Sequence, residues 1–176
     1  MASQSYLLIL AERQAIAWVL EKQRMAFPRT GRPQVAQLAV GDELLVYTAR
    51  SAFKNASRDR GRVIGPAVVT SSVVELDEPV VIADREFPRG CGLRIESLAP
   101  FRAGLELRPL VEQLAAFPDP RTWSARLRQS LLALSPADAE LIREKLRPLV
   151  GRPADHLQPY LDIARASPAR RNRKQG

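Results

Sequence analysis

The chain has 176 residues, 45% of them hydrophobic, so it is long enough for one well-buried core and short for two. Its formal net charge of +8 and its pI near 10.5 favour a polyanionic partner, either nucleic acid or an anionic surface. The single cysteine and single histidine exclude an internal disulfide, a multi-histidine metal site and an ordinary Cys-His zinc site.

The positive charge is concentrated at the C-terminal end. Residues 165–176 carry five basic side chains and no acid, which leaves +3 of the +8 for residues 1–164. We expect one domain over 1–164 and a basic, disordered tail over 165–176. A lone cysteine fits a reducing cytoplasm, and the apolar run near the N-terminus is too short for a membrane span, so we expect a cytoplasmic protein with no membrane partner.

The first hundred residues are predicted to be mainly strands around one helix. Residues 6–10 form a continuous apolar run typical of a buried strand, and residues 12–26 change to the spacing of an amphipathic helix. One helical turn over 34–38 precedes predicted strands over 44–47, 63–74, 80–82 and 93–96, with a break at 78–79 and a turn at 87–92. About five strands without alternating helices indicate an α+β fold with a curved sheet or barrel.

Beyond Pro100 the pattern becomes helical. Leucines at helical spacing predict helices over 107–117 and 123–134, separated by the prolines of 118–120. Ser135 followed by Pro136 is a strong helix start, with the helix expected to run to about residue 147. A last helix is predicted over 154–164 despite its internal proline.

A basic loop between the strands at 44–47 and 63–69 has the chemistry of a nucleotide-binding segment. Its guanidinium groups can meet phosphate, its aromatic ring can stack on a base, and its amide can contact a base edge. The residues that carry this hypothesis are Arg50, Phe53, Lys54, Asn55, Arg58 and Arg60. The alternative is a solvated loop whose arginines only keep the protein soluble.

Several segments together resemble the EVE domains of the PUA-like superfamily. They are the opening strand at Tyr6, the helix with Trp18, the Val40-Gly41-Asp42 entry into a strand ending at Tyr47, the strand at 62–65, and the leucine pattern over 107–142. The resemblance covers most of residues 5–146. It implies a PUA-like curved β-barrel with peripheral helices and a pocket for a modified base extruded from DNA or RNA.

By this resemblance the strand after Gly41-Asp42 contributes Tyr47, Thr48 and Arg50 to the base pocket, and the aromatic walls would come from Trp18, Tyr47 and Phe53. The first hypothesis is therefore a non-catalytic reader of a modified or extruded base, such as a modified cytosine, beside residues 41–65. The alternative is a small-molecule or protein-interaction module of the same fold. We expect no enzyme activity, cofactor or metal, because a Cys91–His156 pair would need two isolated residues to meet.

Overall fold

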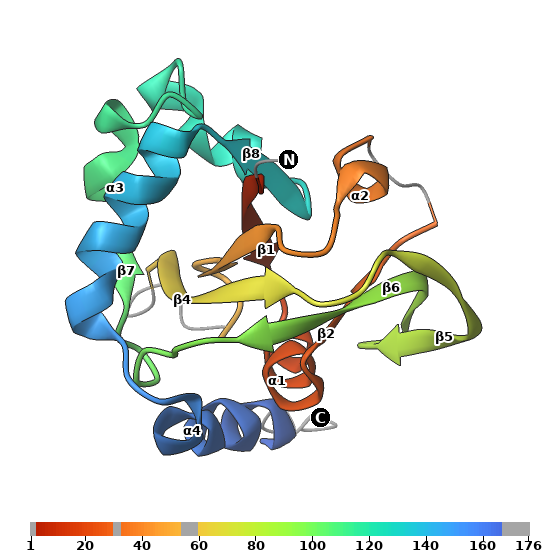
Figure 1. Ribbon diagram of the computed structural model, residues 1–176. Helices are drawn as coiled ribbons and strands as arrows, with labels where there is room; N and C mark the ends of the chain where they lie inside the picture. The colour runs from red at the N-terminus through yellow and green to blue at the C-terminus, as the bar shows by residue number, and fades with distance from the viewer. Residues whose placement is uncertain (1–2, 30–32, 54–59, 167–176) are drawn as a thin grey trace, which may run out of the picture.

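The computed structural model describes residues 3–29, 33–53 and 60–166. Among them lie eight strands, four α-helices and three short 3-10 helices (Figure 1). The strands are β1 (Ser5–Leu10), β2 (Arg24–Phe27), β3 (Glu43–Thr48), β4 (Arg62–Val69), β5 (Val74–Ile82), β6 (Arg85–Ile95), β7 (Leu105–Glu106) and β8 (Leu131–Leu134). The helices are α1 (Arg13–Lys22), α2 (Pro33–Gln37), η1 (Arg108–Gln113), η2 (Pro120–Leu127), α3 (Pro136–Leu146), η3 (Arg147–Leu149) and α4 (Pro153–Arg165).

One mixed sheet organises the molecule. Its strand order is β2-β6-β4-β3-β1-β8, with β5 added to β6 and β7 added to β4. Strands β1 and β3 run parallel, and the other strand pairs are antiparallel. The sheet curls, with α1 and α4 together on one side and α3 on another (Figure 1). This confirms the α+β class and the curved barrel with peripheral helices.

Strand β1 is buried on both faces, which explains its unbroken apolar sequence. Leu8 packs into the cluster inside the curl, whereas Leu7 packs into a second cluster on the outer face. The inner cluster also receives α1, β2, β6 and Tyr160 of α4, and the outer one receives α3 and η1. The sheet therefore lies between two apolar layers.

Two buried carboxylates stabilise turns at the edges of these layers. Asp42 accepts hydrogen bonds from the backbone N–H groups of Gln4 (3.0 Å) and Ala39 (2.9 Å). Asp138 accepts two from Ala115 and Ala116, both at 2.9 Å. The Gly41-Asp42 signal in the sequence is thus a structural turn that leads the chain into β3.

The predicted start of α3 is confirmed. The hydroxyl of Ser135 accepts a hydrogen bond from the backbone N–H of Asp138 at 3.1 Å, and Pro136 occupies the first helical position. The helix is further tied to the sheet by Arg143, whose guanidinium makes two hydrogen bonds to the carboxylate of Glu43, at 3.0 and 2.7 Å. The Glu43 carboxylate raises the pKa of Arg143.

The C-terminal helix α4 forms despite Pro159 and is held at two points. The buried hydroxyl of Tyr160 donates to the carbonyl of Ala99 at 2.8 Å, and Arg13 of α1 donates to the carbonyl of Ala166 at 3.0 Å. The second contact places the end of the described chain beside the start of α1. In the described ranges no helix is long and apolar enough to cross a lipid bilayer.

The helix predicted over 12–26 is wrong in its last turns. Helix α1 ends at Lys22, because Gln23 adopts a left-handed conformation with φ of 50° and its N–H bonds the carbonyl of Val19. The chain then forms β2, which pairs antiparallel with β6. Pairing with a distant strand overrides the local helical pattern.

Several further element predictions are wrong. The strand predicted over 63–74 ends at Val69, the break predicted at 78–79 lies inside β5, and the helix predicted over 107–117 is the shorter 3-10 helix η1. Residues 131–134 form strand β8 instead of the end of a helix, because they pair antiparallel with β1 and bury Leu131 and Leu132 on opposite faces. Residues 87–92 lie inside β6 instead of in a turn. The actual turn is Ala83-Asp84, both with positive φ (49° and 62°), the geometry of a tight β-hairpin.

Candidate base-binding pocket

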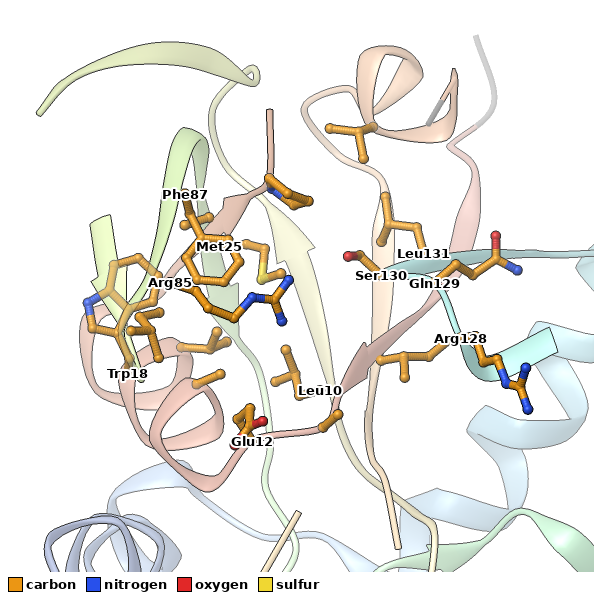
Figure 2. A pocket seen from close by; sticks show the side chains of 18 of the residues that line it. Leu10, Glu12, Trp18, Met25, Arg85, Phe87, Arg128, Gln129, Ser130 and Leu131 are labelled. Atoms are coloured by element: carbon orange, nitrogen blue, oxygen red, sulfur yellow. The ribbon is translucent and has the colours of Figure 1, made fainter. Parts of the chain in front are cut away.

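A cavity of about 420 Å³ lies between the two ends of the curled sheet (Figure 2). Its lining comes from segments far apart in sequence: the end of β1, helix α1, strand β2, helix α2, the β5–β6 hairpin, and residues 127–131. Both terminal strands of the sheet, β2 and β8, contribute residues, so the cavity occupies the seam that the curl leaves open. Its volume falls in the range of small-ligand pockets.

The floor of the cavity is apolar. Leu10, Val19, Met25, Val35 and Leu131 line it and belong to the inner apolar cluster. Two backbone hydrogen bonds fix this floor at its edges: the N–H of Ile9 donates to the carbonyl of Ser130, and the N–H of Ala49 donates to the carbonyl of Leu10, both at 2.9 Å. The floor is thus part of the core and is preformed.

Two half-buried aromatic side chains stand on one side of the cavity. They are Trp18 of α1 and Phe87 of β6, and both lie on the left in Figure 2. An arginine guanidinium lies over each ring. The guanidinium carbon of Arg24 is 5.7 Å from the Trp18 ring centroid, and that of Arg85 is 5.5 Å from the Phe87 ring centroid. Aromatic faces of this kind are stacking surfaces for a planar ligand.

Polar groups surround the apolar floor. Glu12 precedes α1 and makes no side-chain capping bond, and the guanidinium of Arg85 reaches from the hairpin into the middle of the cavity (Figure 2). On the opposite wall lie Gln129 and Ser130. The side-chain carbonyl oxygen of Gln34 is buried and has no hydrogen-bond partner among the described residues. The pocket therefore combines stacking surfaces with both donors and acceptors.

Six of the nine residues predicted from the sequence lie in the described ranges, and of these six Trp18 alone lines the cavity. Tyr47 is 2% exposed and packs in the outer cluster, where burial raises its pKa to about 12. Thr48 is 3% exposed and its hydroxyl donates to the carbonyl of Arg62 at 3.4 Å. Neither side chain lines the cavity, and contact of either one with a base stays a prediction.

The loop residues lie elsewhere. Phe53 packs edge-to-face on Phe101, with ring centroids 5.0 Å apart, and Arg60 pairs with Glu106 at 3.6 Å. Arg50 is exposed just beyond β3, one residue after the Ala49 that bonds Leu10. Three residues lie outside the described ranges: Lys54, Asn55 and Arg58. A nucleic-acid contact by the loop stays a prediction.

Arg85, Phe87, Gln34 and Glu12 line the cavity but are not among the residues predicted from the sequence. The first two were hidden by the misplaced turn at 87–92. The local signal for the hairpin is the apolar run at 80–82 followed by the turn residue Asp84 and then by Phe87. No local signal distinguishes Gln34 or Glu12 from ordinary helix-end residues.

Cys91 and His156, the pair considered for catalysis, lie on different elements, strand β6 and helix α4. Cys91 is buried in β6 and burial raises the pKa of its thiol to about 11, which disfavours the reactive thiolate at neutral pH. His156 lies on α4, beside Gly151. The described part of the chain contains no cluster of His, Cys, Asp and Glu side chains that could hold a metal ion.

No protein-family model and no curated protein matches the sequence. Solved structures do match the fold. A hypothetical protein from Leishmania major aligns at 14% identity, covering 84% of this chain and 96% of that chain, with a TM-score of 0.55. The YTH domain of the Zygosaccharomyces rouxii MRB1 protein, in complex with N6-methyladenosine RNA, aligns at 13% identity, covering 82% and 86%, with a TM-score of 0.57.

A second YTH domain, that of the protein mmi1 in an RNA complex, aligns at 10% identity over 82% of this chain and 81% of that chain, with a TM-score of 0.57. Identities this low show a shared fold. The chain therefore has a fold that is also found in RNA-bound YTH domains.

Proposed function

We propose that the protein is a non-catalytic module that binds single-stranded RNA and holds one unpaired base in the cavity between the sheet ends. The observation that carries the proposal is the pairing of Trp18 and Phe87 on one side of a preformed apolar pocket. A base inserted there would stack on aromatic carbon while its polar edge met Arg85 or Glu12.

Energetics favour an unpaired target. Extruding a base from a duplex costs a few kcal/mol, and less when the base is damaged, modified or already unpaired. Stacking on an aromatic side chain contributes about 1 to 3 kcal/mol per base. One stacked base therefore offsets little more than the extrusion cost, so the module should prefer single strands to duplex.

The fold supports nucleic acid as the ligand class, since YTH domains of this fold are found in RNA complexes, one with N6-methyladenosine. We retain as a proposal the EVE-type relationship within the PUA-like superfamily, which likewise implies a base pocket. Because this resemblance suggests a modified cytosine, the binding experiments include an RNA that carries 5-methylcytosine. The basic residues of the 50–60 loop and of residues 165–176 would supply phosphate contacts.

A small-molecule module is the second candidate, favoured by the apolar floor and the ligand-sized volume. The salt dependence of the affinity separates the two. Each phosphate contact on a single strand adds about −0.7 to the slope of log affinity against log salt, whereas an uncharged ligand in an apolar pocket gives a slope near zero.

The direct test uses tryptophan fluorescence. The chain has two tryptophans, Trp18 in the pocket and Trp123, which packs on Phe117 with ring centroids 6.0 Å apart. In the Trp123→Phe variant Trp18 is the sole tryptophan, and single-stranded RNA should quench its emission saturably. In the reciprocal Trp18→Phe variant RNA should bind, as shown by the anisotropy of a labelled strand, without quenching Trp123.

Trp18→Ala should weaken binding by about 1 to 3 kcal/mol, which is about 5- to 150-fold in Kd. Its melting temperature is measured alongside, because Trp18 also packs against the inner cluster. Quenching of Trp123 but not of Trp18 would move the binding site away from the cavity. Binding of neither single-stranded RNA nor single-stranded DNA to the full chain would contradict the proposed function.

A further inference from the structure

We propose that the base held in the pocket is guanine, selected by Arg85 from one edge of the ring and by Glu12 from the other. This inference rests on the proposed function, and it adds the chemical class of the bound base. It follows from the kinds of hydrogen-bonding groups that the cavity presents and from how two of them are held.

The guanidinium of Arg85 is positioned to donate two parallel hydrogen bonds to a ligand in the cavity. Its position at the start of β6, directly after the tight turn at Ala83-Asp84, brings the side chain back over the cavity. The guanidinium carbon lies 5.5 Å from the Phe87 centroid, so the ring supports the guanidinium while leaving its N–H groups available. Among the described residues, no carboxylate forms a salt bridge with Arg85.

The two hydrogen-bond acceptors of the cavity, Glu12 and Gln34, come from elements other than the hairpin that carries Arg85. Glu12 lies just before α1 and makes no side-chain hydrogen bond to the helix end, so its carboxylate is available at the cavity. The side-chain oxygen of Gln34 on α2 is buried without a partner among the described residues. A buried acceptor without a partner costs free energy, which a ligand N–H would relieve. The cavity thus presents a donor fork and, from other elements, two acceptors.

Guanine has the matching arrangement. Its O6 and N7 are adjacent acceptors, the pair that an arginine contacts in a bidentate way, and its amino group is a donor. Adenine places an amino donor next to N7, which would oppose the guanidinium N–H groups. Uracil has a single acceptor on the corresponding edge, and cytosine has a donor there. A base with a fixed positive charge would be repelled by Arg85.

The experiment compares four seven-nucleotide RNAs that differ in the central base, G, A, C or U, within the same flanking sequence. A fifth carries 7-deazaguanine, which lacks the N7 acceptor, and two more carry N6-methyladenosine and 5-methylcytosine. Binding to the full chain with Trp123→Phe is measured by Trp18 quenching. A bidentate contact predicts that the guanine strand binds about 5- to 150-fold more tightly than the adenine strand, and that 7-deazaguanine loses part of this preference.

Three variants assign the preference to its residue. Arg85→Gln should abolish the guanine preference, and Arg85→Lys should keep most of the charge-dependent affinity but lose the preference, because an ammonium lacks the planar fork. Arg94→Gln is the matched control: Arg94 is exposed on the same strand, pairs with Glu96 and does not line the cavity, so this variant should keep the preference. Glu12→Gln should reduce the guanine preference in part.

The outcomes separate the two proposals. Equal binding of all four bases, a preference that survives Arg85→Gln, or tighter binding of either methylated base overturns the guanine inference while leaving the module a base reader. Absence of Trp18 quenching by every strand contradicts the pocket as the binding site. Guanosine monophosphate that binds as tightly as the guanine strand would support the guanine pocket and assign it to free nucleotides instead of RNA.

Discussion

The hydroxyl of Tyr160 offers the sharpest test of how α4 is attached to the sheet. The residue is 1% exposed, its hydroxyl donates to the buried carbonyl of Ala99 at 2.8 Å, and its ring packs edge-to-face on Phe101 with centroids 5.4 Å apart. Tyr160→Phe keeps the ring and leaves the Ala99 carbonyl without this donor. Loss of such a bond costs about 1 to 2 kcal/mol. For a domain of this size the melting temperature should fall by about 2 to 8 °C.

Thermal unfolding followed by circular dichroism, with urea unfolding at 25 °C, measures the loss. Tyr47→Phe is the matched control, because it removes the hydroxyl of a tyrosine that is likewise buried as a residue, at 2% exposed, but that packs in the outer cluster and has no part in attaching α4. We expect the control to lose less than half as much stability. Equal losses in the two variants would refute the reasoning, since the Tyr160 bond would then contribute nothing beyond the burial of a hydroxyl.

Other predictions follow from burial, close approach and capping. Burial raises the pKa of Tyr47 to about 12, above the unfolded value of about 10, so its contribution to stability is complete below pH 10 and is lost as pH rises toward 12. Urea unfolding at pH 8, 10 and 11 should show a decline to which Tyr47 contributes about 3 kcal/mol at its limit. Burial also raises the pKa values of Tyr160 and Cys91, so Tyr47→Phe should make the decline shallower without removing it. Gly65→Ala would bring a methyl carbon into a clash with the carbonyl oxygen of Ser97, and the forced backbone shift should cost about 1 to 3 kcal/mol in urea unfolding. Gly41→Ala, where the nearest atom is 3.7 Å away, tests strain from a positive φ of 92° alone. Ser135→Ala should destabilise the domain by about 0.5 to 2 kcal/mol through loss of the α3 cap, while Ser135→Thr should retain most of that stability; an unaffected melting temperature in the alanine variant would show that Pro136 suffices to start the helix.

Elements whose signals are local could be predicted from the sequence. The apolar run at 6–10, the Ser135-Pro136 start of α3, the short helix near 34–38 and the last helix near 154–164 all occur where the sequence places them. Each depends on contacts within a few residues or on burial of a continuous apolar segment. The curved α+β fold follows from these elements, because several strands without alternating helices leave few other arrangements.

The pocket was decided by tertiary structure. Trp18 could be recognised as an aromatic candidate, but its partner Phe87 depends on a hairpin turn at Ala83-Asp84, and Tyr47 is buried because both faces of β3 are covered. Strand β2 forms only because β6 is there to pair with it, so the seam that the cavity occupies has no local sequence signal. The sequence by itself thus determined the basic character and the elements whose signals are local. Which side chains meet at the seam depends on strand pairing across distant residues, which local spacing does not encode.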